Sequence, residues 1–217
     1  SNILVIKLNM RTRIKICGIT RVEDAMLAVD LGADAVGLIF HPASPRFVDL
    51  NVAKQIRKIV PAFVDLVGVF VNTEAQKVHQ IQKDVHLDLI QLHGDESPEF
   101  AETLGLPYIK ALSAERSREL NANDLGYVSA RAFLLDSRSE QSYGGTGQAF
   151  DFAAWPTETL ARLILAGGLG PEYLQEPIKQ LNPYAVDLNS GVESEPGRKD
   201  PDKLVASFEQ IEALRTN

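Results

Sequence analysis

A chain of 217 residues with 45% hydrophobic and 24% charged residues has the size and composition of an ordinary globular domain. Its formal net charge of −7 argues against nucleic acid as a general partner, because no basic stripe is present to neutralise phosphates. The single cysteine excludes an internal disulfide and favours a reducing cytoplasm, and no apolar run is long enough to predict a membrane-spanning helix.

The regular pattern of the chain begins at Thr12. Residues 1–11 precede it, and we expect them to be an N-terminal extension. Ser1-Asn2 resembles a remnant of an expression tag, and Met10 is a possible alternative start. No linker or low-complexity segment interrupts residues 12–217, which predicts that they form one domain.

Apolar, strand-like runs alternate along the chain with amphipathic, helix-like runs. The run Val64–Val71 is almost wholly apolar, as expected of a strand that is covered on both faces. The predicted strands are Arg13–Cys17, Ala35–Phe40, Phe63–Val71, Leu87–His93, Tyr108–Leu112, Ala132–Asp136, Leu163–Ala166 and Ala185–Asn189.

Helices are predicted between these strands. Thr20 and Glu23 have the spacing of a capping box, and Gly32 marks the end of the helix that they begin. Pro98 suits the first position of a later helix. The other predicted helices are Asp49–Val60, Thr73–Lys83, Ser97–Leu104, Ala114–Leu120, Phe152–Trp155, Pro171–Leu181 and Asp200–Leu214.

Strand–helix units of roughly 25 residues predict a parallel sheet. Eight such units in about 200 residues predict a single (β/α)₈ TIM barrel. A doubly wound open sheet is the alternative. The strand count and the lack of a G-x-G-x-x-G fingerprint after the first strand favour the barrel.

Two candidate catalytic residues stand at predicted strand ends, where barrel enzymes carry out their chemistry. Cys17 ends the first strand, and a thiol acts as a base or nucleophile when its surroundings favour the thiolate. Asp136 follows three apolar residues, an environment in which a carboxylic acid can keep its proton near neutral pH. The plainer interpretations are a small buried hydrophobe for Cys17 and a helix cap or solvated loop residue for Asp136.

Other polar side chains fall near the same strand ends. Arg46 lies in a proline-restrained loop and offers a planar fork for a carboxylate, or else it is a solvated loop arginine. Alternation places Gln91 and His93 on one face, which we take as the barrel interior, although a lone histidine commonly has a structural role. Lys110, in an apolar strand, is either a site group or a rim charge.

Glycine-rich segments follow the last two predicted strands, at Gly167-Gly168 and at Ser190-Gly191. Together they indicate a phosphate site built from backbone N–H groups, which can hold an anion in an acidic protein without basic residues. A third segment, Gly144–Gly147 with Gly145 inside it, either lets backbone approach a ligand or is a plain flexible loop. No histidine spacing typical of a metal site is present, so no metal is expected.

Taken in order, these motifs resemble those of the phosphoribosylanthranilate isomerase family of tryptophan biosynthesis, and they cover nearly the whole chain. The motifs that carry the resemblance are Lys15–Thr20, Ser44–Arg46, Gln91–Gly94, Leu135-Asp136, Gly144–Gly147, Ala166–Leu169, Asp187–Glu193 and Pro196–Asp200.

The resemblance implies a cofactor-free Amadori rearrangement of N-(5-phosphoribosyl)anthranilate to 1-(o-carboxyphenylamino)-1-deoxyribulose 5-phosphate. It implies that Cys17 is the general base and Asp136 the general acid, with the thiol pKa lowered and the carboxyl pKa raised. It also implies that Arg46 holds the anthranilate carboxylate. The expected partner is this phosphorylated small molecule, and the active form is a monomer or a homodimer. The remaining expected substrate-binding residues are Gln91, His93, Gly145, Gly167, Gly168, Asp187, Ser190 and Gly191.

Two other functions are weighed against this one. The first is another phosphosugar barrel, either an epimerase, which often needs metal-binding histidines, or an indole-forming synthase, which needs lysines and glutamates at strand ends. Only Lys110 is a candidate for the latter. The second is a non-catalytic barrel that binds a phosphorylated ligand, which would be favoured if Cys17 or Asp136 were buried and pointed out of the barrel mouth.

Overall fold

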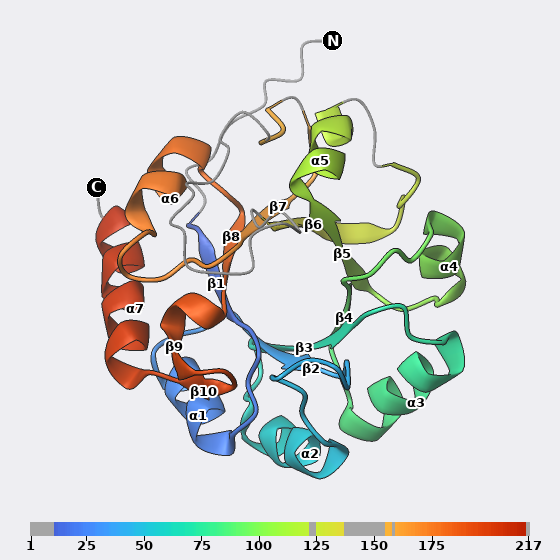
Figure 1. The fold of residues 1–217 in the computed structure, drawn as a ribbon, viewed down its shortest axis with the longest axis horizontal. Coiled ribbons are helices and arrows are strands. Elements are labelled where there is room, and N and C mark those ends of the chain that lie inside the picture. Colours follow the sequence, from blue (N-terminus) through green and yellow to red (C-terminus); the bar gives the residue numbers. More distant parts are fainter. Residues whose placement is uncertain (1–10, 122–124, 137–154, 158, 216–217) are drawn as a thin grey trace.

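The computed structural model describes residues 11–121, 125–136, 155–157 and 159–215. Within them, eight parallel strands follow one another around a closed barrel, and the last pairs with the first (Figure 1). The predicted (β/α)₈ barrel is therefore confirmed, and the open doubly wound sheet is wrong. The strands are β1 Arg13–Ile16, β2 Ala35–Ile39, β3 Asp65–Phe70, β4 Leu89–Leu92, β5 Tyr108–Ser113, β6 Ala130–Asp136, β7 Leu163–Ala166 and β8 Ala185–Leu188.

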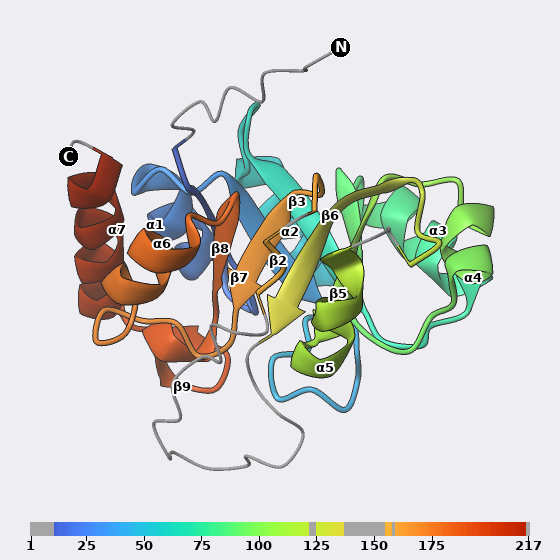
Figure 2. The same cartoon turned by 90° about the horizontal axis from the view of Figure 1, so that it is seen from above.

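Helices surround the strands and flank the barrel on both sides in the turned view (Figure 2). A two-stranded antiparallel hairpin, β9 Glu193–Glu195 and β10 Arg198–Lys199, follows β8. None of the helices in the described part of the chain has the length and apolar character that a membrane span requires. The helices are α1 Val22–Asp30, α2 Leu50–Ile59, α3 Ala75–Val85, α4 Pro98–Thr103, α5 Ala114–Ser117, α6 Gln175–Leu181 and α7 Pro201–Arg215.

The strands separate two buried layers, which explains why their sequences are apolar on both faces. In β1, Ile14 and Ile16 belong to the large cluster between the barrel and the helices, whereas Lys15 and the following Cys17 do not. Alternation thus directs two apolar side chains outward and the two polar ones inward. A smaller cluster fills the barrel interior, with members Ile109, Ala111, Ala132, Leu134, Ile164, Ala166 and Ala185.

Most helix boundaries lie within a few residues of the predictions, and the exceptions have identifiable causes. The predicted capping box at Thr20 is wrong, because the Thr20 hydroxyl donates to the Gly197 carbonyl and Arg21 becomes the N-cap, without a side-chain cap. The stretch from Pro171 does not begin a helix, because a turn intervenes before α6 starts at Gln175. The short helix predicted at 152–155 falls mostly outside the described residues.

A buried ion pair outside the barrel supports the exit of β4. The Lys110 ammonium contacts the Glu96 carboxylate at 2.8 Å and donates to the carbonyl oxygens of Leu92 and Gly94, at 3.4 and 2.6 Å. Lys110 is fully buried, so the prediction of a rim charge is wrong; nor does it line the cavity described below. The pair instead holds the loop that follows β4, at whose start His93 lies.

Candidate active site

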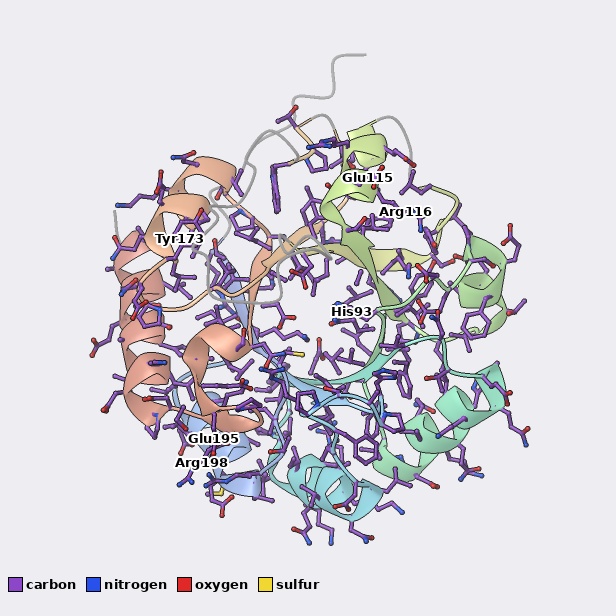
Figure 3. All side chains as sticks on the ribbon, in the orientation of Figure 1. His93, Glu115, Arg116, Tyr173, Glu195 and Arg198 are labelled. Carbon is purple, nitrogen blue, oxygen red and sulfur yellow. The ribbon has the colours of Figure 1, made fainter. Side chains whose placement is uncertain are left out.

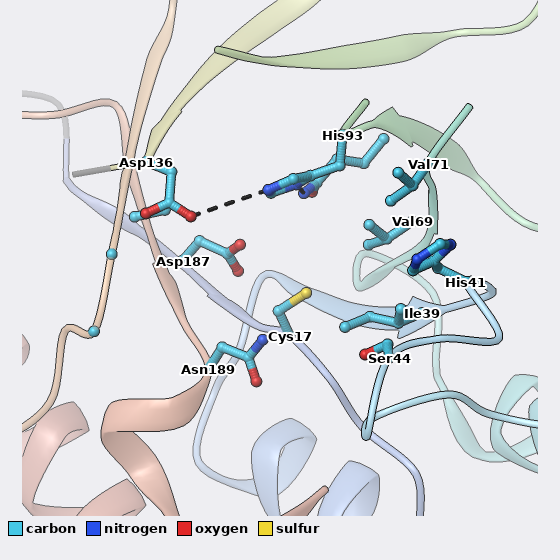
Figure 4. Close-up of a pocket in the computed structure, with 14 residues that line it drawn as sticks. Cys17, Ile39, His41, Ser44, Val69, Val71, His93, Asp136, Asp187 and Asn189 are labelled. Atoms are coloured by element: carbon cyan, nitrogen blue, oxygen red, sulfur yellow. Dashed lines mark hydrogen bonds and ion pairs between the residues drawn. The ribbon is translucent and has the colours of Figure 1, made fainter. Parts of the chain in front are cut away.

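A cavity of about 190 Å³ lies at the C-terminal ends of the barrel strands. Cys17 enters it just after β1, His93 just after β4, Asp136 at the end of β6 and Asp187 from β8. Figure 4 shows these four side chains directed toward one space, and Figure 3 shows His93 pointing into the centre of the barrel. The cavity therefore brings together the two predicted catalytic residues and five of the predicted substrate-binding residues, namely Gln91, His93, Gly167, Gly168 and Asp187.

Cys17 lies at the base of this cavity with only 3% of its surface exposed. Its backbone N–H donates to the Leu188 carbonyl at 2.8 Å, which extends the β1–β8 pairing to the residue that carries the thiol. Burial raises the pKa of the Cys17 thiol, and the Asp187 carboxylate raises it further, while Lys15 and Lys199 act in the opposite direction. The expectation of a lowered thiol pKa is therefore wrong, because loss of hydration outweighs the nearby cations.

Asp136 and His93 face each other across the cavity. The His93 Nε2 atom and the Asp136 carboxylate are 4.0 Å apart, and about a third of each side chain is exposed. The Gln91 side-chain amide lies 2.8 Å from His93 Nδ1 and is hydrogen-bonded to the imidazole ring. Burial lowers the pKa of His93, although the Asp136 charge opposes this, and the neutral ring is favoured.

Lys15 lies inside the barrel, two residues before Cys17. Its ammonium contacts the Asp187 carboxylate at 2.8 Å, and the two side chains are only 4% and 7% exposed. Burial acts to lower the pKa of Lys15, but the charges of Asp187 and Cys17 outweigh it and leave the pKa raised. Sequence reasoning assigned no function to Lys15. Its pairing with Asp187 is a contact that sequence reasoning missed.

Arg46 makes a bidentate contact with a carboxylate of its own chain. Its Nε donates to Glu193 Oε1 at 2.9 Å and its Nη2 to Glu193 Oε2 at 2.7 Å. The side chain is 18% exposed, so the solvated loop arginine is wrong. It does not line the cavity, although Ser44 of the same loop does. The clamp on the anthranilate carboxylate remains a prediction. Arg46 Nη1 has no hydrogen-bond partner among the described residues, so this atom is the one that could donate to the carboxylate.

Glu193 is itself enclosed by cations. Its carboxylate also accepts from Lys199 Nζ at 3.0 Å, and Lys199 Nζ in turn donates to the Asn189 side-chain oxygen at 3.0 Å. Burial acts to raise the pKa of Glu193, but Arg46 and Lys199 together lower it. Sequence reasoning assigned no function to Glu193, Lys199 or Asn189; the only signal for them was that they fall within the motifs after the eighth strand.

The two glycine-rich exits lie against each other. A Cβ atom added to Gly191 would stand 2.1 Å from the Leu169 carbonyl oxygen, which only a glycine avoids. Gly167 and Gly168 adopt left-handed φ angles of 112° and 69° and line the cavity, whereas Ser190 and Gly191 do not line it. Their binding of phosphate remains a prediction, and Gly145 lies outside the described residues.

A closed parallel barrel with a thiol, carboxylates and an imidazole in one cavity at its C-terminal mouth defines a (β/α)₈-barrel enzyme. The family model for N-(5'-phosphoribosyl)anthranilate (PRA) isomerase matches residues 14–210. The chain belongs to this family. It is an isomerase of tryptophan biosynthesis, and the two alternative functions weighed from the sequence are wrong for it.

Relatives support this assignment over most of the chain. The N-(5'-phosphoribosyl)anthranilate isomerase of Nitrosococcus oceani is 45% identical over 205 residues, which are 94% of this chain and 100% of that protein. The crystal structure of phosphoribosyl anthranilate isomerase from Thermus thermophilus is 40% identical, with a TM-score of 0.80, covering 94% of this chain and 100% of that one. A second phosphoribosyl anthranilate isomerase structure, 35% identical with a TM-score of 0.77 and the same coverage, holds reduced 1-(o-carboxyphenylamino)-1-deoxyribulose 5-phosphate.

Proposed function

We propose that Cys17 and Asp136 are the base and the acid of the isomerisation of N-(5'-phosphoribosyl)anthranilate. The observation that carries the proposal is that both side chains open onto the same 190 Å³ cavity, from β1 and from β6. A sugar bound between them has one group on each side, which the two proton transfers require. The partly exposed Asp136 carboxyl reaches the cavity more freely than the buried thiol.

The chemistry needs one proton given and one proton taken. Asp136 donates a proton to the furanose ring oxygen as the C1–O bond breaks and the anilino nitrogen forms a C=N bond to C1. The iminium acidifies the C2–H bond, and the Cys17 thiolate removes that proton to leave an enolamine. The C2 hydroxyl then loses its proton, C1 gains one, and the aminoketose results. The residues need no metal or cofactor for these steps.

The two ends of the substrate are proposed to bind at separate places. The phosphate is assigned to the backbone of Gly167, Gly168, Ser190 and Gly191, whose segments pack together beside the cavity. The anthranilate carboxylate is assigned to Arg46, which Glu193 holds by its Nε and Nη2 edge, leaving Nη1 to donate. Gln91, His93 and Asp187 are proposed to contact the pentose between these ends, since they line the cavity there.

The active unit is proposed to be a monomer or a homodimer, and the Thermotoga maritima isomerase, 32% identical to this chain, is described as dimeric. Light scattering on the purified protein distinguishes these two states by mass. A cytoplasmic location is proposed on the biosynthetic activity and on a single cysteine, which suits a reducing compartment.

The test is to compare wild type with Cys17→Ala in an assay that follows the loss of anthranilate fluorescence on isomerisation. We expect kcat to fall by at least about a hundredfold, because the base is removed. Thermal unfolding of the same two proteins is the control, since a small side chain is exchanged for a slightly smaller one. Near-normal turnover by a folded Cys17→Ala protein would refute the assignment of the base.

A further inference from the structure

A buried ammonium lies beside the thiol that is proposed to act as the base. Lys15 on β1 and Cys17 just after it both point inward, and Gly37 of the neighbouring β2 makes room for both. A Cβ atom on Gly37 would stand 2.8 Å from Cys17 Sγ and 3.2 Å from Lys15 Cε, so the sulfur and the lysine stem converge on one point. The two side chains therefore share a pocket that no larger residue at position 37 would leave open.

The charged groups around this thiol divide into two sets. Asp187 on β8 disfavours the thiolate, whereas Lys15 on β1 and, less strongly, Lys199 on β10 favour it. Asp136 on β6 and the neutral ring of His93, just after β4, face the thiol from across the cavity (Figure 4). Lys15 is the leading group in favour of the thiolate, and its 4% exposure keeps water from screening the interaction.

We propose that Lys15 is a positioning residue for the isomerisation, whose ammonium, held in place by Asp187, is the counter-ion of the Cys17 thiolate. This inference rests on the proposed function of Cys17 as the base. The thiol gives its proton to water in the cavity, and Lys15 keeps its own three protons throughout. Asp187 fixes the ammonium beneath the sulfur, and the resulting Asp187–Lys15–Cys17 row carries a single net negative charge once the thiolate forms.

The competing explanation is that Lys15 only neutralises a buried Asp187 and has no effect on the sulfur. The chain offers a direct way to separate the two, because Cys17 is its only cysteine. The rate at which iodoacetamide alkylates the folded protein, measured against pH, reports the thiolate of that one residue without any use of activity.

The experiment compares wild type with Lys15→Met, which keeps the length of the side chain and removes the charge. We expect the alkylation midpoint to move to a pH about 1 higher, so that alkylation below the midpoint is about tenfold slower. The acidic limb of the kcat/KM profile is expected to move in the same direction. An unchanged alkylation midpoint in a folded Lys15→Met protein would overturn the inference.

A matched control and a fallback complete the design. Lys110→Met removes an equally buried lysine from a 2.8 Å ion pair on the outer face of the barrel, and we expect its alkylation midpoint to equal that of wild type. If Lys15→Met does not fold, Lys15→Met/Asp187→Asn is compared with Asp187→Asn alone, and the same upward movement of the midpoint is expected between them. An unmoved midpoint in that comparison also overturns the inference.

The outcomes separate this inference from the proposed function. If the Cys17→Ala protein turns over substrate normally, Cys17 is not the base, whatever the alkylation profiles show. If the Cys17→Ala protein is inactive and the alkylation midpoint of Lys15→Met is unchanged, the assignment of Cys17 as the base stands. Only the proposed role of Lys15 is then refuted.

Discussion

Two lysine–carboxylate pairs of equal length lie on opposite faces of the barrel wall. The Lys15–Asp187 pair lies inside the barrel beneath the cavity, and the Lys110–Glu96 pair lies outside it, next to the loop after β4; each has a separation of 2.8 Å and is almost completely buried. Their surroundings differ in one respect. The inner ammonium has the Cys17 thiol beside it, whereas the outer one donates to two backbone carbonyls.

The electrostatic outcome differs accordingly. Burial lowers the pKa of Lys110, and Glu96 does not fully compensate. At Lys15, Asp187 and Cys17 together outweigh burial and raise the pKa. The comparison shows that a buried lysine of this barrel supports the structure when it faces outward, as Lys110 does. When it faces inward, as Lys15 does, it lies beside the proposed catalytic thiol, so the face of the strand decides its role.

The largest expected effect is on activity at the inner face. Asp136→Asn replaces the proposed acid by an amide that cannot give up a proton, so we expect kcat to fall by about 10²- to 10⁴-fold. Because Asp136 belongs to neither buried pair, the thermal midpoint should stay near that of wild type. The fluorescence assay and a thermal melt provide both measurements, and a loss of less than about tenfold would assign the acid to another group.

The next effect is on stability at the outer face. Lys110→Met leaves the Glu96 carboxylate buried without its cation, so we expect the free energy of unfolding in urea to fall by about 3–5 kcal/mol. The kcat of the folded protein should remain close to that of wild type. Lys110→Met/Glu96→Gln, which removes both charges, should lose less stability than Lys110→Met, and equal losses would show that the ion pair is not the cause.

A smaller effect, on substrate binding, is expected at the Arg46–Glu193 pair, which belongs to neither the inner nor the outer lysine pair. Arg46→Ala should raise KM by about 10- to 100-fold and change kcat less, because a charge-assisted contact to the substrate carboxylate contributes about 1.5–3 kcal/mol. Arg57→Ala is the matched control, since Arg57 pairs with Asp88 at 2.7 Å on the protein surface. An equal loss with a substrate analogue that lacks the carboxylate would contradict the clamp.

The smallest expected effect is a pH dependence of stability at the same Arg46–Glu193 pair. The pKa of Glu193 lies below 4.5 in the folded protein, so its ionised form stabilises the fold above about pH 4.5 and this contribution is lost as the pH falls through the folded-state pKa. Urea unfolding of wild type and Glu193→Gln from pH 6 to pH 3 measures it, and the gap between the two should narrow as the pH falls. A constant gap would contradict a lowered pKa for Glu193.

Local patterns in the sequence account for the barrel and for much of the cavity. Strand–helix alternation predicted the eight strands, and the period of two placed Cys17, Gln91 and His93 on the inner face. The predicted capping box at Thr20, in contrast, is wrong. The hydroxyl bonds to Gly197, which is 177 residues away in sequence, and a rule based on neighbouring residues cannot include such a partner.

By itself the sequence determined the fold class, the strand ends that meet at the mouth, and the paired glycine exits, because these depend on periodicity and backbone freedom over a few neighbouring residues. Tertiary structure alone decided which charges meet. Lys15 reaches Asp187 across 172 positions and Arg46 reaches Glu193 across 147, through the closure of β8 on β1 and the hairpin that follows it. The direction in which the pKa of Cys17 moves was also decided there, because burial depends on the packing of the whole barrel around one sulfur atom.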